Sequence, residues 1–144
     1  MMAWTLDRLG HALPGVLRHP SHPSGTAPLG AISTDTRSIS AGDVFVALRG
    51  ERFDGHDFLA QAAASGAAAF VVDDAARVGG LGLPSFVVTN TTHALGALGS
   101  WWRNRWPGTV VAVAGSNGNT TTKELVRSAL SASLDVYATT GNLN

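Results

Sequence analysis

Residues 110–124, VVAVAGSNGNTTTKE, combine residue types that can bind a phosphate group. An apolar run leads into a glycine-rich turn, and the turn leads into residues that can start a helix. Glycines let backbone N–H groups converge on an anion, and the helix N-terminus adds free N–H groups and the positive end of its dipole. Gly115 and Gly118 supply the flexible positions, and Thr120 stands where a hydroxyl would bind Mg²⁺. The segment predicts a nucleotide-binding loop, with an ordinary glycine turn between strand and helix as the alternative.

Two positions depart from the general phosphate-loop pattern G-x-x-x-x-G-K-[ST]. Val113 replaces the first glycine, and Asn119 replaces the lysine. Asparagine keeps polarity but lacks the positive charge, and removal of one preorganised charge contact commonly costs several kcal/mol of transition-state stabilisation. Lys123, the single lysine, lies one helical turn further on, and we interpret it as a solvated helix position rather than a replacement. The pattern is compatible with weak nucleotide binding but predicts poor catalysis.

The elements that must position this loop alternate between strands and helices. Apolar runs predict strands at both ends of 31–50, at 67–74, at 85–89, at 109–115 and at 135–140. Helical spacing predicts helices up to about residue 17, over 55–66, over 91–106 and after residue 118. We expect an α/β fold with a small N-terminal domain over 1–89. Residues 90–144 are expected to form a linking helix and the first strand, loop, helix and strand of a doubly wound domain, which is truncated because one βαβ unit does not complete a sheet.

The helix expected over residues 91–106 has apolar side chains at spacings of 3, 4 and 4 on one face: Leu95, Leu98, Trp102 and Trp106. Thr91 or Thr92 is the expected cap at its start. Gly96 and Gly99 cost helix propensity, which predicts close packing against another element. The tryptophans of this helix are interpreted as core residues rather than a base-stacking surface, because the chain has no basic patch.

Composition argues against several classes of function. Of the 144 residues, 44% are hydrophobic and 14% are charged, with 10 basic and 10 acidic side chains, so we expect neither nucleic acid nor a membrane as a partner. There are no cysteines, which excludes disulfides and thiolate metal sites. The N-terminus does not read as a secretory signal and no apolar run approaches the roughly 20 residues that span a bilayer, so we expect a cytoplasmic protein. His19 and His22 lie in a proline-rich stretch and are interpreted as exposed loop residues rather than a metal pair.

Several stretches, in the same order along the chain, resemble the Mur ligases, the cytoplasmic enzymes that build the peptidoglycan peptide. They are STDTR at 33–37, GDVFVALRGERFDGHDF at 42–58, AGSNGNTTTKE at 114–124 and GNLN at 141–144. In that family the loop typically reads T-G-[ST]-N-G-K-T-[ST], so Val113 is no departure there, whereas Asn119 is. The combination points to the family member that joins D-alanyl-D-alanine to UDP-N-acetylmuramoyl-tripeptide. The member that adds the third peptide residue shares part of the pattern.

The resemblance implies an ATP-dependent amide ligation. ATP would phosphorylate the terminal carboxylate of UDP-MurNAc-tripeptide, and the amine of D-Ala-D-Ala would then attack the acyl phosphate, releasing ADP and phosphate. Catalysis in such a transfer rests mostly on positioning and on charge neutralisation by Mg²⁺ and cations. The family's metal ligands, adenine pocket and domain for the incoming amine are not among these residues. We therefore expect that this chain alone does not ligate.

The resemblance also assigns site residues, although it assigns no catalytic residue. The ATP-binding residues would be Gly115, Ser116, Asn117, Gly118, Asn119, Thr120 and Thr121, with Thr120 also assigned to Mg²⁺. The residues that bind the UDP-linked substrate would be Ser33, Thr34, Asp35, Thr36, Arg37, Arg49, Gly50, Asp54, Gly55, His56, Asn142 and Asn144. Arg37 is the candidate partner of the diphosphate, because a guanidinium fork matches phosphate oxygens, and a local pair with Asp35 is the alternative. The DGH turn at 54–56 has a purely structural role as its alternative.

Two readings outside a catalytic ligase stay open. The first is a binding module that retains recognition of the UDP-muramoyl group and has lost ATPase function, and Asn119 favours it. The second is an unrelated α/β protein with a coincidental glycine turn. The ordered run of matching stretches argues against this second reading.

Overall fold

The computed structural model describes residues 3–13 and 23–140. The chain divides into two compact units, Met1–Trp106 and Pro107–Asn144. The predicted loop histidines His19 and His22 and the predicted substrate residues Asn142 and Asn144 lie outside the described residues. The first helix ends at Ala12 rather than near residue 17, because Leu13 has a non-helical backbone conformation and caps it. In the described ranges, no helix is both long enough and apolar enough to cross a membrane.

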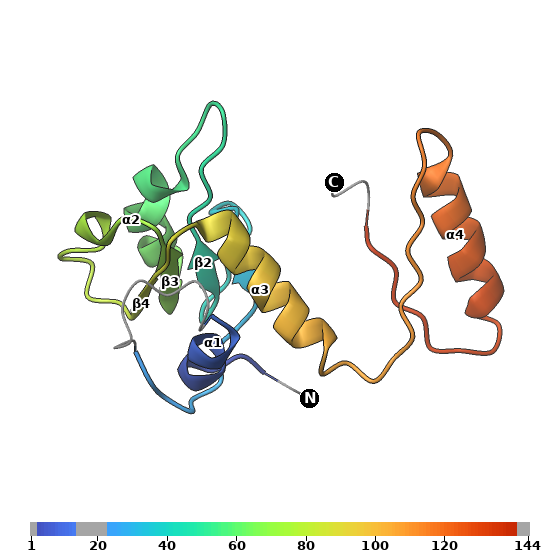
Figure 1. The fold of residues 1–144 in the computed structure, drawn as a ribbon, viewed down its shortest axis with the longest axis horizontal. Helices are drawn as coiled ribbons and strands as arrows, with labels where there is room; N and C mark the ends of the chain where they lie inside the picture. The colour runs from blue at the N-terminus through green and yellow to red at the C-terminus, as the bar shows by residue number, and fades with distance from the viewer. Residues whose placement is uncertain (1–2, 14–22, 141–144) are drawn as a thin grey trace. The chain divides into compact units, whose positions relative to one another are not determined.

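The first unit is built around a parallel four-stranded sheet with the strand order β1-β2-β3-β4 (Figure 1). The strands are β1 (Ile32–Ser33), β2 (Val44–Val46), β3 (Ala69–Val72) and β4 (Ser85–Val87). All residues of β2 and β3 are buried, as expected for a parallel sheet that is covered on both faces. The α/β class and these four strand positions confirm the sequence predictions.

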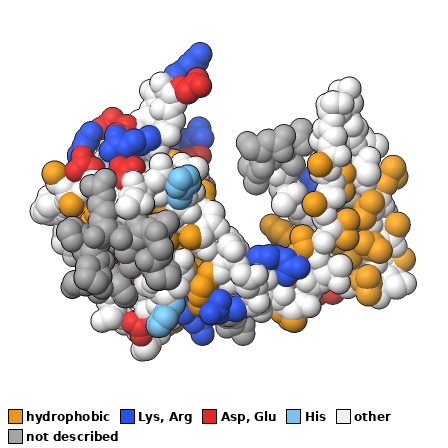
Figure 2. All heavy atoms as spheres, viewed as in Figure 1, with side chains coloured by type: hydrophobic (Ala, Val, Ile, Leu, Met, Phe, Trp, Pro, Cys, Tyr) orange, Lys and Arg blue, Asp and Glu red, His pale blue; other side chains and the backbone are white. Residues whose placement is uncertain are grey.

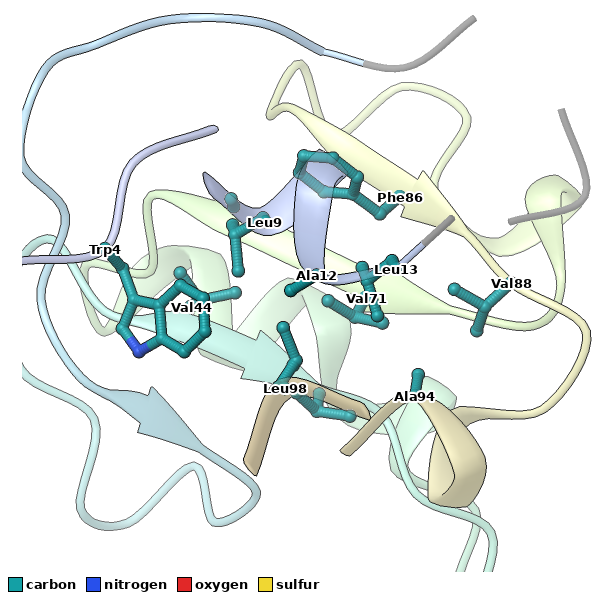
Figure 3. Packing of buried hydrophobic residues seen from close by; sticks show 12 residues of the cluster. Trp4, Leu9, Ala12, Leu13, Val44, Val71, Phe86, Val88, Ala94 and Leu98 are labelled. Carbon is teal, nitrogen blue, oxygen red and sulfur yellow. The ribbon is translucent and has the colours of Figure 1, made fainter. Parts of the chain in front are cut away.

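One face of the sheet is covered by α1 (Leu6–Ala12) and α3 (Thr91–Arg103). Because successive strand residues point to opposite faces, alternate side chains such as Val44 and Val71 point into this layer. Figure 3 shows them meeting Leu98 of α3 and the side chains of α1. This cluster is the larger of the two hydrophobic cores.

The other face is covered by α2 (Leu59–Ala64), which is preceded by the short 3₁₀ helix η1 (Gly55–Phe58). Leu59 of α2 packs with Phe45 and Phe70, all of them at most 2% exposed. Burying each such side chain contributes about 1.5–3 kcal/mol relative to leaving it exposed. A second 3₁₀ helix, η2 (Ala75–Arg77), follows β3.

The predicted helix over 91–106 is present as α3, but it begins and ends differently. Asn90 is the N-cap, because its Oδ1 accepts the His93 N–H at 2.9 Å, and the prediction of Thr91 or Thr92 is wrong. The helix ends at Arg103. Residues of α3 lie in the core of the first unit, and the two compact units divide after residue 106.

The two glycines of α3 do not pack closely, contrary to the prediction. A Cβ built on Gly96 or Gly99 would meet no atom within 4 Å. The buried face of the helix is formed instead by Thr91, Ala94 and Leu98. Both glycines therefore face open space.

Tryptophans join the start of the chain to the end of α3. The ring centroids of Trp4 and Trp101 are 5.1 Å apart, and those of Trp4 and Trp102 are 5.0 Å apart. The Arg105 guanidinium lies 3.8 Å from the Trp101 ring centroid, a cation–π contact. The core interpretation is confirmed for Trp101 and Trp102, which pack against the larger cluster, but it is wrong for Trp106, which is 55% exposed.

The second unit contains α4 (Asn119–Leu130), which confirms the helix predicted after the glycine turn. The strands predicted at 109–115 and 135–140 are wrong, because neither segment forms one. A strand is held by hydrogen bonds to a neighbouring strand, and none of the described strands pairs with either segment. Val111 is 61% exposed and Tyr137 is 89% exposed. Of the expected strand–loop–helix–strand unit, the loop and the helix are formed.

Candidate substrate and nucleotide sites

The parallel sheet brings the two predicted substrate stretches to the same edge. β1 runs directly into the 33–37 stretch, and its neighbour β2 is followed by residues 48–55. Asp73 follows β3 at this edge. In open parallel sheets, ligands bind in the crevice outside the carboxyl ends of the strands. Both stretches therefore lie where this architecture binds ligands.

The loop after β1 is held by its own hydrogen bonds. The Ser33 hydroxyl donates to the Asp35 carbonyl at 3.1 Å. The Arg37 guanidinium donates two hydrogen bonds to the Asp35 carboxylate, from Nε to Oδ1 at 2.9 Å and from Nη2 to Oδ2 at 2.6 Å. The Arg37 side chain, followed by the Arg37 backbone N–H, lowers the pKa of Asp35 from 3.8 to about 2. The local Asp35–Arg37 pair, which was the alternative reading, is present.

This ion pair leaves the loop open to a ligand. The Arg37 side chain is 86% exposed, and Thr34 is exposed beside it, while Thr36 is half-buried. A diphosphate could reach the guanidinium from solvent, but it would compete with Asp35 for the same N–H groups. The loop thus offers an accessible cation whose charge is already balanced.

Residues 48–55 form a hairpin that projects after β2. The Gly50 N–H donates to the Phe53 carbonyl at 2.8 Å, and the Gly55 N–H donates to the Leu48 carbonyl at 2.7 Å. Gly55 is required, because a Cβ there would lie 2.8 Å from the backbone N and O atoms of Leu48. Phe53 is 71% exposed near the tip. Figure 2 shows acidic and basic side chains intermixed on this projection and beneath it.

His56 lies at the base of the hairpin and its side chain is fully buried. Its Nδ1 is 2.6 Å from Asp54 Oδ1, and its Nε2 is 3.2 Å from the backbone N of Asp73. The His56 backbone N–H also donates to Asp54 Oδ1, at 3.0 Å, which caps η1. Partial burial raises the pKa of Asp54, but the hydrogen bonds from His56 outweigh it and the pKa lies below its usual value. These contacts match the structural alternative for the DGH turn and leave no ring atom exposed to a substrate.

Two arginines complete the network around His56. Arg49 donates from Nε at 3.1 Å and from Nη2 at 2.9 Å to Asp73 Oδ1, and its Nη1 bonds to Asp54. Arg77 donates to Asp57 Oδ1 at 2.8 Å. The side-chain hydrogen bonds to Asp73 and Asp57 are the main causes that raise the pKa of Arg49 and of Arg77. Four carboxylates, those of Asp54, Asp57, Asp73 and Asp74, thus surround two guanidinium groups, and the network has no surplus positive charge for an anion.

In the predicted nucleotide loop, the side chain of Asn119 forms a hydrogen bond with the loop's own backbone. Gly118 has a φ of 76°, which favours glycine, and α4 begins at the next residue. The Asn119 Nδ2 donates to the Gly115 carbonyl at 2.7 Å. A Cβ at Gly115 would lie 3.0 Å from Asn119 Oδ1, so the amide fits closely over the turn. Asn119 therefore bridges the loop, where the general pattern has a cation.

The remaining loop residues and the single lysine have different surroundings. Ser116, Asn117, Thr120 and Thr121 are exposed. Lys123 Nζ donates to the Thr139 carbonyl and lies 3.6 Å from Glu124 Oε1. With its side chain 17% exposed, Lys123 is not a solvated helix position, and that interpretation is wrong.

Asn142 and Asn144 lie outside the described residues. Within residues 3–13 and 23–140, no cluster of three or more His, Asp or Glu side chains could hold a metal ion.

Three residues that hold these sites in place were missed in the sequence. Asp43 is a buried carboxylate that accepts the N–H groups of Ala31 and Ser40, each at 2.8 Å, and so fixes the turn between β1 and β2. Its position directly before an apolar strand was the available signal, because a buried carboxylate needs such donors. Asp73 had a similar signal as the first acidic residue after β3. The position of Arg77 in the sequence gave no signal of its contact with Asp57.

Known proteins share both the sequence and the fold of this chain. Residues 29–99 match the Mur ligase family, catalytic domain. The UDP-N-acetylmuramoyl-tripeptide–D-alanyl-D-alanine ligase of Escherichia coli (strain K12) is 42% identical over 100% of this chain, which covers 30% of that ligase. A crystal structure of MurF from Acinetobacter baumannii has a TM-score of 0.85 at 36% identity, over 100% of this chain and 31% of that one. The MurF ligase from Thermotoga maritima in complex with ADP has a TM-score of 0.68 at 36% identity, over 79% of this chain and 26% of that one.

These likenesses agree on one class of protein. The chain belongs to the Mur ligase family. It spans about 30% of the length of the relatives that it matches over its whole length, and it corresponds to their N-terminal part. The resemblance found in the sequence is confirmed at this level.

Proposed function

We propose that this chain is the substrate-binding part, with the first nucleotide-binding elements, of an ATP-dependent ligase of peptidoglycan synthesis. The reaction would join D-Ala-D-Ala to UDP-MurNAc-tripeptide. The observation that carries the proposal is the 42% identity over the whole chain to the E. coli ligase of that name. The TM-score of 0.85 to A. baumannii MurF supports it independently. We also propose a cytoplasmic setting, which the cysteine-free sequence fits.

The proposed substrate site lies at the carboxyl edge of the sheet, within the proposed domain of residues 1–89. Arg37 is the proposed partner of the diphosphate, because its guanidinium is exposed and meets one carboxylate. Arg49 is less available, because it contacts both Asp54 and Asp73. Ser33 shapes the loop through its contact with the Asp35 carbonyl rather than by reaching outward. Binding of the diphosphate by Arg37 would require the Asp35 pair to open or to share its donors.

The proposed nucleotide site is the loop of residues 115–121, at the start of the proposed ATP-binding part. Left-handed Gly118, followed by the N-terminus of the twelve-residue α4, fits a phosphate group, and Thr120 is the proposed Mg²⁺ ligand. The charge fits less well, since Asn119 stands at the lysine position and donates to the Gly115 carbonyl. ATP supplies the phosphoryl group that activates a carboxylate in such ligations. This chain contributes amide and hydroxyl contacts, so we expect weak ATP binding and no ligation by the chain alone.

Asn119 also favours a second candidate function, a module that binds the UDP-muramoyl group without catalysis. Both functions share the substrate edge and differ at the loop. The ligase that adds the third peptide residue is a further alternative within the same family, and it would accept a UDP-MurNAc-dipeptide instead.

Calorimetry on the 144-residue chain tests the substrate site. Titration with UDP-MurNAc-tripeptide is expected to give saturable heat that Arg37→Gln weakens. Arg127→Gln is the matched control, because it removes a similar exposed ion pair, to Glu124 in the second unit, and should leave this binding unchanged. A folded wild-type chain that gives no heat with this ligand contradicts the proposal. Stronger binding of the dipeptide form supports the third-residue ligase instead.

A separate assay tests the nucleotide loop. Titration with Mg·ATP is expected to give weak binding, and ADP release with both UDP-MurNAc-tripeptide and D-Ala-D-Ala present is expected to stay at background. Turnover by this chain at the rate of a complete ligase would refute the expected inactivity and would rule out the non-catalytic module.

A further inference from the structure

The hairpin of residues 48–55 has few attachments to the rest of the first unit beyond its two chain ends. Within the described part of the chain, its ion pairs and side-chain hydrogen bonds to the surrounding fold go to His56, Asp73 and Arg77. Leu48, at its start, packs against the larger core, whereas its tip residues 51–53 are exposed, so no apolar burial holds the tip in place. A segment with few buried apolar contacts opens at low free-energy cost. Its order therefore depends on the polar contacts at its base.

We propose that His56 is a positioning residue that pins this hairpin to the end of β3, and that the pinned hairpin is the form that receives the UDP-linked substrate. The second half of this proposal rests on the function proposed above. His56 acts through Asp54, on the hairpin, and through Asp73, on β3. The carboxylates of Asp54 and Asp73 also pair with Arg49, which faces Asp54 across the hairpin. The contacts of His56 therefore fix both strands of the hairpin.

The pin requires one particular protonation state of the imidazole. Nε2 lies 3.2 Å from the Asp73 backbone N and 3.3 Å from Asp73 Oδ1. A protonated Nε2 could donate to Oδ1, but the Asp73 N–H would then lose its acceptor, and Oδ1 already accepts two N–H groups from Arg49. The neutral ring with a proton on Nδ1 gives each group a partner: Nδ1–H donates to Asp54, and Nε2 accepts from Asp73. Buried polar groups are satisfied in this way in the large majority of cases.

The arrangement explains why a buried histidine lies at a predicted substrate motif. The side chain is 0% exposed and both ring nitrogens are used inside the protein, so His56 does not contact the substrate. Its effect must pass through the carboxylates at its two ends. Loss of the ring leaves Asp54 held by Arg49 and by the backbone N–H of residue 56, while the Asp73 N–H has no acceptor. The hairpin would stay in the fold but lose its fixed orientation.

Nuclear magnetic resonance tests the pin without any ligand. In a ¹⁵N-histidine-labelled chain at neutral pH, we expect His56 to show the neutral form protonated at Nδ1. A neutral ring protonated at Nε2, or an imidazolium ring, would overturn the pin. In His56→Leu, exchange of the hydrogen-bonded hairpin amides of Gly50 and Gly55 is expected to rise relative to wild type, while the amides of β3 stay protected. Unchanged exchange at both Gly50 and Gly55 would also overturn it.

Two conservative variants separate positioning from simple loss of stability. His56→Asn retains a donor near the Nδ1 position, and His56→Gln places an acceptor near the Nε2 position. For UDP-MurNAc-tripeptide we expect Kd to rise about ten-fold in His56→Leu, since one oriented hydrogen bond to a charged group is lost, and to be partly restored in one of the two conservative variants. Leu98→Ala is the control, because it removes core packing on the opposite face and should lower Tm without changing Kd below the transition.

The outcomes distinguish the pin from the proposed function. If wild type does not bind the UDP-linked ligand, the proposed function fails, and the pin is decided by the tautomer and the exchange data. If wild type binds and His56→Leu, still folded, binds equally well, the positioning role is wrong even where the tautomer is as expected.

Discussion

At the residue scale, the groups that the motifs single out for chemistry are engaged by their own neighbours. Arg37 is held by Asp35, Arg49 by Asp54 and Asp73, and Asn119 bonds across its own loop. Motif spacing showed which residue types stand in a pattern. The local Asp35–Arg37 pair was the alternative reading of the sequence, whereas the contact of Arg49 with Asp73, 24 residues away, depends on the tertiary fold.

The Asp35–Arg37 pair gives a testable pH dependence. We expect Arg37→Gln to raise the pKa of Asp35 from about 2 towards its ordinary 3.8, because the forked hydrogen bond is the main cause of the shift. Since the folded-state pKa is depressed, the pair stabilises the fold above the unfolded pKa, and this contribution is lost as pH falls from about 4 to about 2. Titration of the Asp35 carboxyl by NMR measures the shift. Arg127→Gln should leave it unchanged, and an equal pKa in wild type and Arg37→Gln would contradict the assignment.

Asn119 gives a second prediction at this scale. Asn119→Lys should bind Mg·ATP at least about ten-fold more tightly than wild type, because a charged donor replaces an amide that bonds to its own loop. Calorimetry with Mg·ATP measures the change. Asn119→Ala is the matched control, because it also frees the Gly115 carbonyl but adds no charge. Equal gains in both variants would show that opening the loop, rather than the charge, limits binding.

At the scale of elements, the spacing of apolar residues predicted where the helices lie, but it did not predict which of their residues cap them or pack against other elements. The predicted α3 is present, yet its cap is Asn90 and its glycines face open space. Helical spacing identifies a buried face, but a glycine has no side chain to show which face it occupies. The strands at 109–115 and 135–140 failed for a related reason. Apolar runs show what can be buried in a sheet, whereas a strand forms only beside a partner.

The exposed glycines of α3 provide a stability test. Gly96→Ala and Gly99→Ala should each raise the free energy of unfolding by about 0.5–1 kcal/mol, because alanine loses less backbone entropy in a helix and meets no neighbour here. Urea unfolding with an unchanged m-value measures the gain. Gly55→Ala is the opposite control, since its Cβ would lie 2.8 Å from the Leu48 backbone and must destabilise the hairpin base. Destabilisation by both α3 variants would mean that these glycines do pack against another element.

At the scale of the whole molecule, the hydrophobic core belongs to the first unit. Every buried hydrophobic side chain in the described ranges lies between Trp4 and Leu98. The four-stranded sheet could be anticipated from the sequence because its strands are short apolar runs separated by turns. The division after Trp106 could not, because α3 has the composition of a linking helix and reveals its membership only through its contacts with α1 and β3.

A chain of residues 1–106 is therefore expected to fold by itself. Circular dichroism should show a single cooperative thermal transition with a Tm close to that of the first unit in the full chain, because the removed segment contributes no described buried residue. Residues 107–144 alone are the complementary test and should show at most a marginal helix, since α4 has no buried face. A non-cooperative or unfolded 1–106 chain would mean that the second unit supports the first.

The aromatic residues are divided between the units in a way that has a spectroscopic use. All four tryptophans lie in the first unit, three of them in contact, and the single tyrosine, Tyr137, lies in the second. Tryptophan emission thus reports on the first unit alone. Excitation of Tyr137 followed by energy transfer to tryptophan reports on the separation of the two units. The chain contains its own donor and acceptors, so the distance between the units can be measured in solution without any added label, with and without a ligand.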